Sequence, residues 1–255
     1  MKTASAFRSV AAAGLLALAA GQAVAGEARV AVASNFTSAV EAIAERFEAA
    51  TDHEVTLVFG STGKHYAQIH NGAPFDAFFA ADVKRPRLLD EEGMAVPKSR
   101  FTYAVGRIVL WSPKEGYVDP EGRVLEGGGF RHLAIANPRL APYGKAAEQV
   151  LRGRGLWDTL RGRMVRGENI GQAFQFVKSG SAELGFVAYS QVKRPNRRTE
   201  GSLWAPPRSS YSPIEQQAVL LNENEAARAF MAFVKGPEAT AIIQGFGYGT
   251  PAADQ

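Results

Sequence analysis

Three features recur in the same order along this chain, and this order restricts the folds open to it. Each unit has a short apolar run, then a few small polar residues, then an amphipathic helix. The apolar run 29–33 is followed by Ser34-Asn35-Phe36-Thr37-Ser38, and the run 55–59 by Gly60-Ser61-Thr62-Gly63. After the first turn, an apolar helix face repeats at Val40, Ile43, Ala44 and Phe47. Strands alternating with helices in this way predict an α/β fold.

The same order continues through the rest of the chain. Further strands are predicted at 75–80, 108–111, 133–136, 184–188 and 214–221, the last with a polar interruption at Glu215-Gln216-Gln217. Further helices are predicted at 64–70, 82–93, 145–151, 172–178, 225–234 and 238–244. Because most strand segments are continuous apolar runs, we expect mostly parallel sheets covered by helices on both faces.

The first 25 residues have the features of a secretory signal peptide. Lys2 and Arg8 form a positively charged segment before an apolar run at 10–20, and Ala23-Val24-Ala25 is a small-residue cleavage site. The run is too short for a membrane-spanning helix, which needs about 20 residues. We therefore expect cleavage near Ala25 and a periplasmic protein.

The composition excludes several kinds of chemistry. The chain has no cysteine, so a disulfide framework, a thiol nucleophile and a thiolate metal site are all ruled out. The formal net charge of +4 is a small excess for 255 residues, and export disfavours nucleic acid as a partner. No nucleophile–base signature is present, so we do not expect an enzyme.

Four strand-to-helix junctions are the candidate binding elements. They are 33–35, 60–63, 137–144 and 168–171, and each is rich in small polar residues or glycine. In open α/β sheets, ligands bind beyond the carboxyl ends of the strands. Helix N-termini there present backbone N–H groups that have no partner within the helix. Several such ends converging on one point would bind an anion without a cationic side chain, although each Ser or Thr alone is also an ordinary helix cap.

The chain resembles the periplasmic molybdate-binding proteins of ABC transporters, the ModA family. The resemblance runs through nearly all of the chain after residue 25. Five segments carry it: VASNF at 32–36, FGSTGK at 59–64, GAPFDAFFAAD at 72–82, LGFVA at 184–188 and KGPEA at 235–239. It implies a two-lobed periplasmic solute-binding protein fold of type II, in which each lobe is a mostly parallel sheet flanked by helices. The expected lobes are 26–105 plus 216–255, and 106–215.

The resemblance also implies a ligand and the residues that hold it. The ligand is molybdate or tungstate, bound as an oxyanion with no direct protein ligand to the metal and no cofactor. The implied binding residues are Ser34, Asn35, Thr62, Tyr143 and Ile170, with Ser61 as a less certain member. Tyr143 would donate through its backbone N–H and also through its side chain, and Ile170 through its backbone N–H. The implied partners are the permease and ATPase subunits of an ABC importer, served by a monomer.

One position departs from the family pattern. Many members have a tyrosine ligand directly after the strand that matches 184–187, whereas this chain has Ala188 there. Tyr189 comes one residue later and is therefore expected on the other side of the strand. Tyr143 and Asn35 are the residues that can replace the missing hydroxyl.

The remaining polar residues allow other assignments. Gly60-Ser61-Thr62-Gly63-Lys64 lacks the spacing of a phosphate-binding P-loop. The four histidines, among them His65 and His70, are expected at the solvated surface rather than on a metal. Five arginines are expected to form a solvated face: Arg152, Arg154, Arg161, Arg163 and Arg166. The main alternative function is a protein of the same fold that binds sulfate or another oxyanion.

Overall fold

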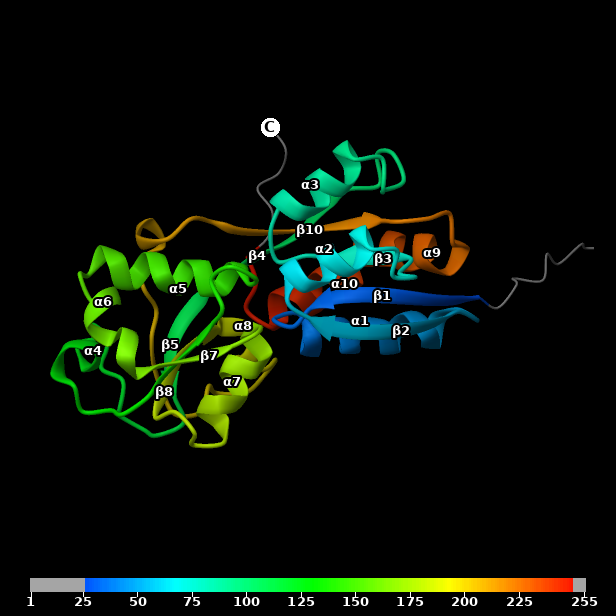
Figure 1. The fold of residues 1–255 in the computed structure, drawn as a ribbon. Coiled ribbons are helices and arrows are strands. Elements are labelled where there is room, and N and C mark those ends of the chain that lie inside the picture. The colour runs from blue at the N-terminus through cyan, green and yellow to red at the C-terminus, as the bar shows by residue number, and fades with distance from the viewer. Residues whose placement is uncertain (1–25, 250–255) are drawn as a thin grey trace, which may run out of the picture.

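The computed structural model describes residues 26–249, which form two α/β lobes (Figure 1). The predicted signal peptide, 1–25, lies outside these residues. Each lobe is built on one five-stranded sheet, with strand orders β2-β1-β3-β10-β4 and β7-β6-β8-β5-β9. This confirms the predicted two-lobed α/β fold class. Among residues 26–249, no helix is both long enough and apolar enough to cross a membrane.

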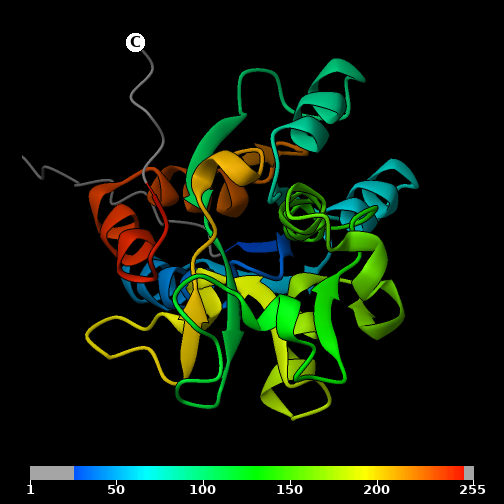
Figure 2. The same cartoon turned by 90° about the vertical axis from the view of Figure 1, so that its left-hand side faces the viewer.

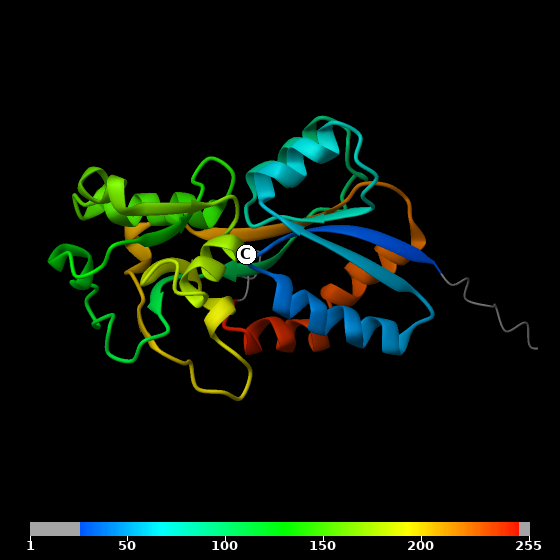
Figure 3. The same cartoon turned by 60° about the horizontal axis from the view of Figure 1, so that its bottom comes forward.

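The first lobe contains both ends of the described chain. Its strands are β1 (Glu27–Ala33), β2 (Glu54–Gly60), β3 (Ala77–Phe79), β4 (Phe101–Gly106) and β10 (Ile214–Leu220). Its helices are α1 (Thr37–Ala50), α2 (Thr62–His70), α3 (Lys84–Glu91), α9 (Glu225–Val234) and α10 (Pro237–Gly245). Helices α1, α9 and α10 pack on one face of the sheet and α2 and α3 on the other, as Figure 3 shows.

The second lobe comprises the middle of the chain. Its strands are β5 (Ile108–Ser112), β6 (Leu133–Ala136), β7 (Met164–Gly167), β8 (Leu184–Ala188) and β9 (Ser202–Trp204). Its helices are α4 (Val124–Gly127), α5 (Pro142–Gly153), α6 (Trp157–Leu160), α7 (Ile170–Lys178) and α8 (Tyr189–Val192), with 3₁₀ turns at Arg161–Arg163 and Arg208–Ser210. Helix α5 packs on one face of the sheet, and α7 supplies Val177 to the core on the other.

Both sheets are mixed, rather than mostly parallel as the sequence led us to expect. In the first, β1 pairs in parallel with β2 and β3, whereas β10 runs antiparallel to β3 and β4. In the second, β6 is parallel to β7 and β8, whereas β5 is antiparallel to β8 and β9. The antiparallel pairs arise where the chain changes lobes, because β4 leads directly into β5 and β10 returns to the first sheet. The lobe boundaries at 105/106 and 215/216 stay predictions of the sequence.

Three strands were absent from the sequence prediction: β4, β7 and β9. All three are edge strands of their sheets. They are short or include partly exposed positions, so they lack the continuous apolar run that marks the central strands.

Candidate functional site

Four strand-to-helix junctions meet at one small pocket between the lobes. The first lobe contributes the ends of β1 and β2, and the second contributes the starts of α5 and α7. The pocket is lined by Ala33, Ser34, Asn35, Gly60, Ser61, Thr62, Ala81, Ala141, Pro142, Tyr143, Asn169 and Ile170. All six residues predicted from the sequence are therefore brought together here, and all six are buried. None of the lining residues carries a charged side chain.

Local sequence explains why helices begin at this pocket. Ser61 is the N-cap of α2 and its hydroxyl accepts the Lys64 N–H at 3.3 Å. Asn169 is the N-cap of α7 and its Oδ1 accepts the Gln172 N–H at 2.9 Å. Pro142 occupies the first turn of α5, where its missing N–H has no cost. The positive ends of these helix dipoles face the pocket.

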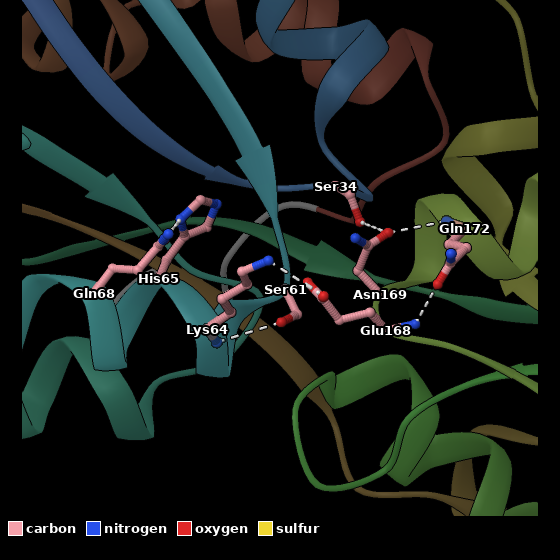
Figure 4. Close-up of polar contacts among 8 residues, drawn as sticks. All are labelled: Ser34, Ser61, Lys64, His65, Gln68, Glu168, Asn169 and Gln172. Atoms are coloured by element: carbon pink, nitrogen blue, oxygen red, sulfur yellow. Dashed lines mark hydrogen bonds and ion pairs between the residues drawn. The ribbon is translucent and has the colours of Figure 1, made fainter. Parts of the chain in front are cut away.

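Ser34 connects the two lobes. Its hydroxyl donates to Asn169 Oδ1 at 3.1 Å (Figure 4). The same hydroxyl oxygen accepts the N–H of Gly171 at 3.1 Å. At the edge of the pocket, Lys64 Nζ lies 3.3 Å from Glu168 Oε2, which is also an interlobe contact. Both of these charged side chains are about half exposed, so we expect the ion pair to stabilise closure only slightly.

Thr62 is placed to donate into the pocket. Its hydroxyl oxygen accepts the Ala81 N–H at 3.0 Å, which leaves the hydroxyl proton available for a second partner. Its backbone N–H and those of Tyr143 and Ile170 lie in the first turns of helices, where no intrahelical acceptor exists. The pocket therefore presents mainly hydrogen-bond donors.

The Tyr143 side chain turns toward β10 and joins a buried polar network. Its hydroxyl accepts from Gln216 Nε2 at 3.2 Å. Gln216 Oε1 in turn accepts from Asn35 Nδ2 at 2.7 Å and from the Tyr103 hydroxyl at 3.0 Å. Burial raises the pKa of Tyr143 well above its ordinary value, so this hydroxyl is neutral. Tyr143 thus contributes its backbone N–H to the pocket, while its side chain links the second lobe to the first.

The network includes residues that the sequence reasoning did not assign to the site. Tyr248 donates to the Asn35 carbonyl at 2.7 Å and accepts from Asn35 Nδ2 at 3.0 Å. The only sequence signal for Gln216 was the polar interruption in an otherwise apolar strand. It is fully buried, at a register shift between β10 and β4. No local pattern marks Tyr103 or Tyr248.

The prediction that the histidines are solvated is wrong for His65. This side chain is 2% exposed, and its Nε2 and Nδ1 lie 3.2 Å from the Val32 carbonyl and 3.1 Å from Gln68 Oε1. Burial lowers its pKa, so the ring is neutral at pH 7. The ring occupies the space that a side chain on Gly60 would need, because a Cβ there would lie 2.7 Å from Nε2. Within 26–249, no cluster of three or more His, Cys, Asp or Glu could hold a metal ion.

The Ala188 departure is visible in the structure. Ala188 is fully buried in the second-lobe core, and Tyr189 begins α8 on the opposite side. The Arg107 guanidinium lies 5.4 Å from the centre of the Tyr189 ring. Tyr189 is not among the residues that line the pocket.

Two α/β lobes with a polar pocket at the ends of their strands define a solute-binding protein. The bacterial extracellular solute-binding protein family matches residues 28–249. The molybdate-binding protein ModA of Azotobacter vinelandii is 52% identical over 240 residues, which cover 93% of this chain and 94% of that protein. ModA of Rhodobacter capsulatus is 48% identical over 231 residues, covering 89% and 90%.

A solved structure gives the same result. The periplasmic molybdate-binding protein of Azotobacter vinelandii superposes with a TM-score of 0.85 at 48% identity, covering 88% of this chain and 100% of that one. The chain therefore belongs to the bacterial extracellular solute-binding protein family, and within it to the ModA group.

Proposed function

We propose that this protein binds molybdate in the periplasm and delivers it to an ABC importer, and that it is not an enzyme. The observation that carries the proposal is the convergence of helix N-termini and hydroxyl groups on a pocket without a carboxylate. The ModA relatives narrow the class of anion to molybdate. We expect tungstate, which is almost the same size, to bind similarly.

The donors can balance the cost of burying a dianion. An unpaired buried charge costs many kcal/mol, so molybdate needs several hydrogen bonds. The proposed donors are the hydroxyls of Ser34 and Thr62, with Ser61 less certain, and the backbone N–H groups of Tyr143 and Ile170. On binding, the Ser34 hydroxyl would turn its proton from Asn169 Oδ1 to the anion. With Asn35, roughly six or seven charge-assisted hydrogen bonds of about 1.5–3 kcal/mol each would form. Since these bonds can offset desolvation and lobe closure, we expect sub-micromolar affinity, beyond about −8 kcal/mol.

Asn35 must reorient to serve as a donor. Its Nδ2 is directed to Gln216 and Tyr248, and its Oδ1 is buried without a hydrogen-bond partner among residues 26–249. A half-turn of the amide would direct Nδ2 to the anion. After a matching half-turn of the Gln216 amide, its Nε2 would donate to Asn35 Oδ1 and its Oε1 would accept from the Tyr143 hydroxyl. In the second orientation Asn35 Oδ1 gains the donor that it lacks in the first, and this offsets the Nδ2–Tyr248 contact that is given up. An anion can therefore select the second orientation at little cost.

The donor-rich pocket also gives a basis for selectivity. Hydrogen phosphate carries a proton that requires an acceptor, and the pocket has no carboxylate to provide one. Sulfate has the charge and shape of molybdate but shorter bonds, so only the spacing of the donors can reject it. A pocket fitted to sulfate or another oxyanion is the alternative function.

Calorimetric titration of the purified protein tests the ligand. We expect one equivalent of molybdate, and likewise of tungstate, to bind with a sub-micromolar Kd, and sulfate and phosphate to bind at least a hundredfold more weakly. A preference for sulfate would establish the alternative. No heat with any of the four anions would remove the oxyanion assignment.

A substitution at Gly144 tests the backbone N–H of Tyr143, which no change of the Tyr143 side chain removes. A Cβ at Gly144 would lie 2.4 Å from the Ala136 carbonyl oxygen, which is backbone and cannot move aside. Gly144→Ala must therefore shift the start of α5 and the neighbouring Tyr143 N–H. We expect a loss of about 1–3 kcal/mol of stability. At this size, that lowers Tm by roughly 2–12 °C. Molybdate affinity should fall as well.

Gly153→Ala is the matched control at the other end of the same helix. A Cβ there meets no atom within 4 Å. Alanine in a helix is more stable than glycine by about 0.5–1 kcal/mol, so Tm should be unchanged or slightly higher. Melting curves and titrations of both variants make the comparison. Equal behaviour of the two variants would contradict the packing argument.

A further inference from the structure

A second cavity opens on the surface of the second lobe, outside the interlobe pocket. Its volume is about 400 Å³. It is lined by Asn137, Pro138, Arg139, Glu148, Arg152, Trp157, Asp158, Arg161 and Arg166. We call it the arginine pocket. It contains part of the arginine group that the sequence predicted to be a solvated face.

The arginine pocket carries an excess of positive charge. Its lining has four arginines and two carboxylates, which leaves a net charge of +2. Glu148 is already paired, since it accepts from Arg152 at 2.9 Å and from Lys145 at 3.1 Å. The other three arginines, Arg139, Arg161 and Arg166, are exposed, and no carboxylate of residues 26–249 lies within 4.0 Å of their guanidinium groups. They are available to an anionic partner.

Trp157 orders the guanidinium groups of two arginines of the pocket. Its side chain is buried in the second-lobe core. The guanidinium of Arg152 lies 5.1 Å from the centre of the ring and that of Arg166 lies 5.8 Å away. Cation–π contacts of this kind reduce the freedom of the arginine side chains. A pre-ordered guanidinium presents a planar pair of donors that fits a carboxylate.

The arginine pocket adjoins the interlobe contacts. Its residues 137–139 lead directly into Ala141, Pro142 and Tyr143 of the interlobe pocket. The Arg139 carbonyl accepts from Arg85 of the first lobe at 3.3 Å. Arg166 is two residues before Glu168, which pairs with Lys64 across the lobes. A partner bound at the arginine pocket would therefore contact loops whose position depends on closure.

We propose that the arginine pocket is a docking surface for acidic side chains of the importer's membrane subunit. This inference rests on the proposed function. A protein that delivers an anion must contact its permease, and complementary charge accelerates and orients such an encounter. Exposed, pre-ordered arginines next to the closure contacts let the permease bind the closed form in preference to the open one.

The test uses the importer's permease and ATPase reconstituted in proteoliposomes, with ATPase stimulation measured against the concentration of molybdate-loaded binding protein. The variants are Arg161→Glu, which keeps both Trp157 contacts, and Arg161→Glu with Arg166→Glu. The matched control is Arg197→Glu with Arg198→Glu, in the loop after α8 that projects away from α6 (Figure 2). We expect the half-saturating concentration to rise about threefold or more for the single variant and at least tenfold for the double variant. The control should stay within twofold.

Calorimetry separates this inference from the proposed function. Molybdate affinity should be the same in wild type and both arginine variants, and its absence in wild type would remove the proposed function instead. Stimulation equal to wild type in the double variant, with molybdate binding intact, overturns the docking proposal. A second equivalent of molybdate or inorganic phosphate that binds to wild type and is lost in Arg161→Glu would overturn it too, because the pocket would then hold a free anion.

Discussion

Ser34→Ala combined with Thr62→Ala should lower molybdate affinity by roughly a hundredfold to ten-thousandfold. Each substitution removes a hydroxyl donor to a dianion, worth about 1.5–3 kcal/mol. Two such losses amount to about 3–6 kcal/mol, and each 1.4 kcal/mol is about a factor of ten. The Ser34 substitution also removes the interlobe contacts to Asn169 and Gly171. Calorimetric titration of the purified double variant measures the effect.

Ser179→Ala with Thr240→Ala is the control for this experiment. Ser179, the C-cap of α7, donates to the Phe176 carbonyl, and Thr240 of α10 donates to the carbonyl of its N-cap, Gly236. Neither hydroxyl lines the pocket. Molybdate affinity should therefore stay within about twofold of wild type. If the Ser34 and Thr62 double variant also kept wild-type affinity, the assignment of the pocket as the binding site would be refuted.

Molybdate should raise the melting temperature of the wild-type protein by roughly 8–16 °C. A ligand at a thousand times its Kd adds about 4 kcal/mol to the free energy of unfolding. For a protein of this size, each kcal/mol shifts Tm by about 2–4 °C. Tungstate should give a similar shift. Thermal melts with and without each anion, at equal ionic strength, measure it.

Melting shifts compared across anions and variants distinguish molybdate from sulfate as the ligand, and this pocket from another binding site. Sulfate and phosphate at the same concentration should produce a much smaller shift, and the Ser34 and Thr62 double variant should lose most of the molybdate shift. A large shift with sulfate alone would leave the fold unchanged and replace the ligand. A full molybdate shift in the double variant would mean that the anion binds elsewhere.

Most of the fold could be predicted from the sequence because local signals agree with it. Continuous apolar runs marked the central strands, and helical spacing marked the long helices. The buried face of α1, for example, contains the four predicted residues Val40, Ile43, Ala44 and Phe47. The edge strands β4, β7 and β9 could not be found in this way, since partial exposure on one face removes the apolar run. Nor could the mixed strand directions, which depend on pairings between segments distant in sequence.

The candidate site also has a part that the local sequence predicts and a part that it does not. Small polar residues after apolar strands are a local feature, so the sequence alone determined the junctions at Ser34, Thr62, Tyr143 and Ile170. Tertiary structure decided what these junctions face. It directs the Tyr143 hydroxyl to Gln216 and links Asn35 to Tyr248, over sequence separations of 73 and 213 residues. It also buries His65 under the Gly60 turn. Such contacts depend on how two lobes pack together, and no local pattern of residues encodes that packing.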